Sequence, residues 1–251
     1  MREPLLAPPF DELSALPRRR LAAMRRAAGD LFGTLEEFAR HGRHPVRDVL
    51  AASAKDFTRW EHYPPGDVED RATGCAWYYH AHDPSEARPW EEHGHFHCFM
   101  YSERVRAGAT PISMPANPDF AKGGLIHLLA VSVDSSGTPT HLFAPNRWVT
   151  GEWMYPAADV IPLIDRFAIG GDTRFALTNR WLTAILRLFQ PQIAWLLRDR
   201  DRVLAARREV DPAGFADDRS FEVVSTLSFD LDAQLAALDQ ASSHGSRRHA
   251  A

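Results

Sequence analysis

Five histidines stand at alternate positions in two short segments of the chain, and this spacing limits what those segments can form. They are His80, His82, His93, His95 and His97. Side chains alternate between the two faces of a β-strand, so residues two apart project from the same side of an extended segment. The sequence therefore predicts two strands that each carry their imidazoles on one face.

The two histidine segments are predicted to pair with each other. If the loop over residues 83–92 closes an antiparallel hairpin, His80 and His95 become near neighbours across it. A third strand is expected to add His127, on the same side of that strand as Leu129. Several imidazoles would then share one concave side of a sheet.

A metal ion is the simplest explanation for such a gathering. Several neutral imidazoles that converge on one point satisfy a transition metal better than they satisfy one another. The predicted ligands are His80, His95 and His97, with His82, His93 or His127 as a fourth ligand or an acid–base group. Glu92 or Glu103 could supply a carboxylate, and Tyr78 is placed to orient a ligand or a substrate. Because ligand type does not separate Zn from Fe, the expected cofactor is a divalent transition metal, Zn or Fe.

A second group of polar and aromatic residues follows the predicted fourth strand. It consists of Asn146, Arg147, Trp148, Glu152 and Trp153. Arg147 can clamp a carboxylate or a phosphate, Glu152 can act as a base, and the two tryptophans can wall a pocket. Hairpin register would bring this group near His127. The alternative is a turn held by Arg147 and Glu152, with the tryptophans in the core.

The pattern of apolar residues predicts an α+β fold, a mainly antiparallel sheet of about five strands flanked by N- and C-terminal helices. Residues 1–16 read as an extended lead-in, 17–240 as a single α+β domain and 241–251 as a disordered tail. Predicted helices cover 17–41, 46–54, 156–167 and 173–209, with a last helix ending near 240. Within 173–209, Pro191 is predicted to start a second helical segment. Predicted strands cover 73–82, 93–101, 124–134, 138–145 and 221–229, and 61–72 reads as a loop.

Charge and composition narrow the classes of partner. The formal net charge is −4, which gives no electrostatic footprint for nucleic acid. No apolar run is long enough to cross a membrane or to form a secretory signal, so we expect a cytoplasmic protein. The expected partner is a small-molecule substrate that binds at the histidine face. The two cysteines, Cys75 and Cys98, make no disulfide framework and are predicted to be buried thiols. Oligomeric state is not predicted.

Two segments together resemble an uncharacterised family of bacterial proteins. The family pairs a His-Gly-His-Phe-His segment, here His93–His97, with a segment like Asn146–Glu152. The resemblance would span roughly residues 15 to 235 and implies that both segments belong to one domain. It implies no activity.

The run His93–Phe99 also resembles the histidine-triad pattern, in which three alternating histidines are separated by hydrophobic residues. In that superfamily the middle histidine attacks phosphorus, so the resemblance implies that His95 is the nucleophile of a metal-free phosphoester hydrolase or transferase. The match departs at Gly94, and it leaves His80 and His82 without a role.

The sequence thus predicts a metal-dependent enzyme, an oxidoreductase or a hydrolase, with His95, His127 and Glu152 as catalytic residues. The histidine-triad-like enzyme is one alternative. The other is a non-enzymatic binding protein whose imidazoles merely line a pocket.

Overall fold

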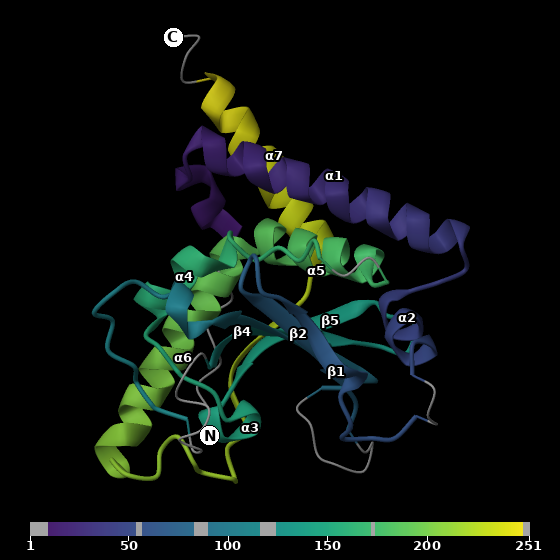
Figure 1. Cartoon of the computed structure of the whole chain (residues 1–251). Coiled ribbons are helices and arrows are strands. Elements are labelled where there is room, and N and C mark those ends of the chain that lie inside the picture. The colour runs from purple at the N-terminus through teal and green to yellow at the C-terminus, as the bar shows by residue number, and fades with distance from the viewer. Residues whose placement is uncertain (1–9, 54–56, 83–89, 116–123, 172–173, 248–251) are drawn as a thin grey trace.

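The computed structural model describes residues 10–53, 57–82, 90–115, 124–171 and 174–247, and these form an α+β fold (Figure 1). At its centre is a six-stranded antiparallel sheet in which each strand pairs with the next one along the chain. The strands are β1 (Tyr63–Asp70), β2 (Cys75–His80), β3 (Gly94–Tyr101), β4 (Leu125–Val133), β5 (Pro139–Pro145) and β6 (Val223–Ser228).

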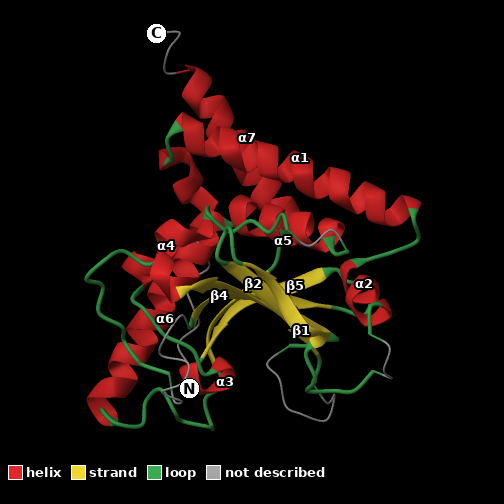
Figure 2. Ribbon diagram, in the orientation of Figure 1, coloured by secondary structure: helices red, strands yellow, loops and turns green. Residues whose placement is uncertain are grey.

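Helices from both ends of the chain gather on one side of this sheet (Figures 1 and 2). Helix α1 packs on α5 and α7, whereas α6 packs on α4, on β5 and on the edge strand β6. The helices are α1 (Arg18–Arg40), α2 (Pro45–Ala51), α3 (Arg147–Thr150), α4 (Ala157–Ile164), α5 (Ala176–Leu188), α6 (Gln190–Val210) and α7 (Leu231–Arg247), with 3-10 turns at Phe10–Ala15 and Ser102–Arg104. In the described part of the chain, no helix is both long enough and apolar enough to cross a membrane.

One face of the sheet carries the main core. The Phe96 ring lies 5.3 Å from the Trp181 ring of α5 and 5.7 Å from the Trp77 ring of β2. The indole N–H of Trp77 donates to the side-chain oxygen of Asn179 at 2.8 Å, which satisfies its buried polar group. Cys98 lies on this face, and both cysteines are buried and free, as predicted. The opposite face carries the histidines.

The predicted fold class is confirmed, but the sheet has six strands because β1 lies in the segment 61–72 that was predicted to be a loop. Pro64, Pro65 and Gly66 are turn-forming residues, and they obscure the strand pattern. Proline is tolerated here because β1 is an edge strand that pairs only with β2. The pairing shifts register between Tyr63 and Val68, which accommodates the irregular residues.

One boundary also differs from the sequence prediction. Helix α7 continues to Arg247, beyond the predicted end near residue 240. The helical pattern over 173–209 forms α5 and α6, and the second of these starts with Pro191 in its first turn as predicted, because a proline in the first turn of a helix costs no hydrogen bond.

Phe96→Ala should lower the free energy of unfolding by about 3–5 kcal/mol, because the ring is fully buried and its removal leaves a cavity. Chemical denaturation measures this loss. Phe32, an exposed phenylalanine on α1, provides the control, and Phe32→Ala should change stability by less than about 1 kcal/mol. Equal losses in the two variants would show that Phe96 does not face the core.

Candidate functional site

The register of β2 and β3 builds the histidine face. In this pair His80 lies opposite His95 and Tyr78 lies opposite His97, which confirms the predicted neighbours across the hairpin. The core residues of β3 alternate with the histidines, so packing of Phe96 against α5 turns His95 and His97 to the other side.

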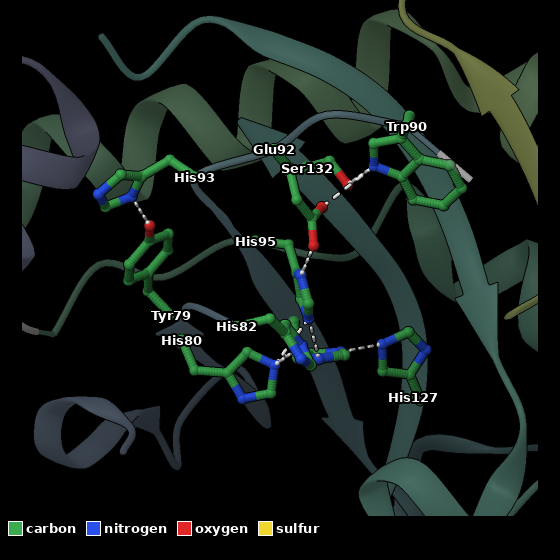
Figure 3. A network of polar contacts seen from close by, with 10 residues as sticks. Tyr79, His80, His82, Trp90, Glu92, His93, His95, His127 and Ser132 are labelled. Atoms are coloured by element: carbon green, nitrogen blue, oxygen red, sulfur yellow. Dashed lines mark hydrogen bonds and ion pairs between the residues drawn. The ribbon is translucent and has the colours of Figure 1, made fainter. Parts of the chain in front are cut away.

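Three imidazoles converge on one point of this face (Figure 3). The Nε2 atoms of His80 and His95 are 2.7 Å apart, and those of His82 and His80 are 3.1 Å apart. One ring nitrogen from each of the three residues lies within 4.8 Å of the others, so together they could hold a metal ion. All three side chains are buried.

The cluster extends from these three residues through two more histidines. Nε2 of His97 lies 2.9 Å from Nε2 of His95, and Nδ1 of His97 lies 2.9 Å from Nε2 of His127. Burial, followed by the neighbouring His95, holds the pKa of His97 well below its usual value. Burial, and then the Arg200 guanidinium, lowers the pKa of His127 to about 3. Both rings are therefore neutral at physiological pH.

A β-bulge brings His127 to this face. Cys98 pairs with Leu129, but the next residue, Phe99, pairs with His127, so Leu128 is the extra residue of β4. Leu129 packs into the main core. The expected neighbourhood of His127 is thus present, whereas its predicted placement on the same side as Leu129 is wrong. A regular strand would have turned His127 into the core.

The Glu92 carboxylate orients the His95 ring through its Nδ1 atom, on the side of the ring away from the other imidazoles. Nδ1 of His95 lies 3.0 Å from Oε1 of Glu92, and the other oxygen of Glu92 accepts from the indole N–H of Trp90 at 3.1 Å. The same N–H lies 3.1 Å from the hydroxyl of Ser132. A carboxylate that accepts from Nδ1–H leaves the lone pair of Nε2 directed at the centre, which is the usual arrangement of a metal-binding histidine.

His93 does not join the cluster, contrary to the sequence prediction. Its Nδ1 lies 2.5 Å from the hydroxyl of Tyr79, and Figure 3 shows this pair apart from the other imidazoles. Gly94 is the first residue of β3, so strand alternation does not extend back to His93. A Cβ on Gly94 would lie 2.4 Å from both the Tyr79 hydroxyl and the carbonyl oxygen of His80, so only glycine lets this tyrosine cross the strand.

Tyr78 shares the histidine face, as its alternation with His80 predicted. Its ring stacks on His62 with centroids 3.6 Å apart and lies 5.3 Å from the Phe99 ring. Burial, together with the carboxyl groups of Glu152 and Asp67, raises the pKa of Tyr78 well above its usual value. Sequence reasoning missed His62 and Asp67 because His62 lies just before β1 and Asp67 lies in the irregular part of this strand, where no spacing pattern marks them.

The segment that follows β5 is anchored to the loop before β6. The side-chain oxygen of Asn146 accepts from the backbone N–H of Arg147 at 2.8 Å, and its amide nitrogen donates to the carbonyl of Phe215 at 3.1 Å. The indole N–H of Trp148 donates to the carbonyl of Phe221 at 3.2 Å. Arg147 forms an ion pair with Asp217. These contacts favour the interpretation of the segment as a stapled turn, although Arg147 pairs with Asp217 and not with Glu152 as predicted.

A small cavity nevertheless joins this segment to His127. It is lined by residues that include His127, Arg147, Glu152, Trp153 and Arg200. Its volume of about 10 Å³ suits roughly one water molecule. Arg147 and Glu152 are therefore close to His127, as predicted, but the space between them is too small for an organic substrate.

Glu152 is held in its neutral form. Burial raises the pKa of Glu152 to about 8, although a hydrogen bond with the Thr150 side chain acts in the opposite direction. Within the described residues, its buried Oε2 atom has no hydrogen-bond partner. A carboxyl group that changes charge near neutral pH suits acid–base chemistry, but burial alone also produces this shift.

Comparison with known proteins identifies the family of the chain. A family model described as Domain of unknown function (DUF6969) matches residues 25–229, so the chain belongs to this family. The match includes both the histidine segments and the segment after β5, which confirms the resemblance to an uncharacterised family. No curated protein and no solved structure matches the chain. The function is therefore argued from the site itself.

Asn146→Ala should lower the free energy of unfolding by about 1–3 kcal/mol, because it removes the N-cap of α3 and leaves the buried carbonyl of Phe215 without its donor. Denaturation curves measure the loss. The spacing of the imidazoles should not change, so binding of added Zn²⁺ should match that of the natural chain. Unchanged stability combined with weaker zinc binding would contradict the stapled turn.

Glu152→Gln should stabilise the metal-free protein increasingly as pH rises. Because its folded pKa of about 8 exceeds the reference value of 4.5, Glu152 takes up a proton on folding between these pH values, and stability falls as pH rises through this range. Glutamine removes that loss, so the variant should gain little at pH 5 and about 2–4 kcal/mol at pH 8. Thermal denaturation across this range measures the difference.

Glu103→Gln is the control, because it changes an exposed carboxylate on the 3-10 turn Ser102–Arg104. The free energy of unfolding of the Glu103→Gln variant should equal that of the natural chain at every pH measured. If the Glu152→Gln curve also runs parallel to the natural one, Glu152 is not held neutral by the fold.

Proposed function

We propose that the chain is a metalloprotein in which His80, His82 and His95 bind one divalent transition metal ion. The observation that carries the proposal is the convergence of their ring nitrogens within 4.8 Å. Each nitrogen of a neutral imidazole makes one hydrogen bond, either as a donor or as an acceptor. Nε2 of His80 lies within hydrogen-bond distance of two other Nε2 atoms, and a shared ion satisfies all three lone pairs.

The surroundings of the three ligands support a functional site. Glu92 orients His95 and is itself held by Trp90, which is how outer carboxylates tune metal ligands. His97 and His127 lie next to the three ligands: Nε2 of His97 is 2.9 Å from Nε2 of His95, and Nδ1 of His97 is 2.9 Å from Nε2 of His127. We assign His97 a supporting role, because it is not one of the three histidines whose ring nitrogens lie within 4.8 Å of one another.

Three protein ligands leave a coordination position open, which is typical of catalytic rather than structural zinc sites. We therefore propose a metal-dependent enzyme that acts on a small molecule. Zinc is favoured over iron because the three ligands are all imidazoles, whereas the common iron(II) oxygenase site combines two histidines with a carboxylate. Zinc supplies Lewis-acid chemistry, so hydrolysis is favoured over oxidation.

The metal-free alternative with His95 as the nucleophile has less support. His93, the first histidine of the triad-like pattern, bonds to Tyr79 and lies away from His95. Nε2 of His95, the atom that would attack phosphorus, lies 2.7 Å from Nε2 of His80 and 2.9 Å from Nε2 of His97. The spacing that resembles the histidine triad thus does not place three imidazoles at one reaction centre.

Protein purified without a polyhistidine tag should contain about one equivalent of a transition metal, or bind one when Zn²⁺ is added. His80→Ala and His95→Ala should each lower the bound metal strongly, since each removes one of three ligands. Elemental analysis and zinc titration measure this, and circular dichroism checks that each variant is folded.

His93→Ala is the matched control, because it removes a histidine of the same motif that points elsewhere. It should bind zinc like the natural chain. The proposal fails if the folded natural protein binds no ion, or if His93→Ala loses as much metal as His95→Ala. A folded, metal-free protein would favour the binding-protein alternative.

A further inference from the structure

A histidine and an aspartate from the edge of the sheet lie beside the proposed ligands. Nδ1 of His62 is 3.0 Å from Oδ1 of Asp67. The His62 ring lies flat on Tyr78, with an angle of 9° between the two planes, and its centroid is 6.0 Å from that of His80. His62 therefore occupies the same face as the ligands without being placed to bind the same ion.

His62 differs from the cluster histidines in its contact with solvent. Its side chain is 44% exposed. By contrast, four histidines of the cluster are each at most 8% exposed. They are His80, His82, His95 and His97. An imidazole that touches both a buried site and bulk water can carry protons between them. The buried imidazoles have no such access.

The backbone of β1 places the aspartate at this histidine. Gly66 has a φ of 84° and Asp67 a φ of 56°, both in the left-handed region. A non-glycine residue in this region is uncommon and costs free energy, and such strain gathers at functional sites. Two carboxyl groups lie near this histidine and the neighbouring Tyr78. They belong to Asp67 and Glu152, and both raise the pKa of Tyr78.

We propose that His62 is the proton-transfer residue of the metal site and that Asp67 positions it; this rests on the proposed metal function. Asp67 accepts from Nδ1–H, so Nε2 of His62 carries a free lone pair. With an ion bound, Nε2 would accept a proton from a water or hydroxyl group held beside it, and the electron pair of the broken O–H bond would stay on that oxygen. The carboxylate of Asp67 balances the imidazolium, which then releases its proton to solvent.

His127 is less suited to this role than the sequence suggested. Nε2 of its ring is engaged by Nδ1 of His97. His127 is half-buried, and it lines a cavity with room for roughly one water molecule. The charge that acts on His127 is the Arg200 cation, which disfavours proton uptake by this ring. The Glu152 carboxyl group that lines the same cavity has a raised pKa.

The test compares ring-¹⁵N-histidine protein in metal-free and Zn²⁺-loaded forms by NMR, with His62 assigned from its loss in His62→Gln. In the natural chain, His62 should carry its proton on Nδ1, and zinc should move its Nε2 resonance upfield as this atom accepts a hydrogen from the zinc-bound water. Asp67→Asn should mix the two ring tautomers and reduce that shift. Glu61→Gln, which removes the neighbouring carboxylate, should leave both unchanged.

Metal analysis of the same samples separates this proposal from the metal assignment. His62→Gln should bind zinc with the stoichiometry of the natural chain. A loss of zinc in this variant would make His62 a ligand and overturn its proton-transfer role. An Nε2 resonance that zinc does not move, or that moves equally in Asp67→Asn, would also overturn it. A natural chain that binds no zinc would instead reject the metal centre itself.

Discussion

The antiparallel pairing of β2 with β3 is the constraint on which the rest of the site depends. One register places Phe96 and Trp77 under α5 and, by alternation, places His95 opposite His80 on the other face. A shift by one residue would exchange the two faces and bury imidazoles against tryptophan. The hydrophobic core therefore selects the geometry of the polar site, although the two share no side chain.

Burying several imidazoles on one face is unfavourable unless each polar atom has a partner. Hydrogen bonds among the rings and the Glu92 carboxylate satisfy part of this need. The rings also pack on aromatic neighbours such as Phe143 and Tyr78, but apolar side chains would fill the same space without any polar atom to satisfy. Such a surface is easier to explain by an ion that the imidazoles bind than by a contribution to stability.

Strand periodicity in the sequence is sufficient to predict the histidine face, because a spacing of two has one structural meaning once the opposite side is apolar. Local backbone irregularities are not predictable in this way. The bulge at Leu128 redirects His127, the strand boundary at Gly94 releases His93, and prolines hide the edge strand that follows His62. Each changes the direction of a side chain without changing any residue spacing in the chain.

The two parts of the proposed site rest on structural elements that suit their tasks. His80 and His95 project from paired strands inside the sheet, where ladder bonds on both sides fix the backbone to which a metal ligand must be attached. His62 and Asp67 come from the edge segment, which pairs on one side only and departs from regular strand geometry. A residue that exchanges protons with solvent has to lie at such an exposed margin. The irregularity that hides β1 in the sequence is therefore also what gives the buried imidazoles a neighbour in contact with water.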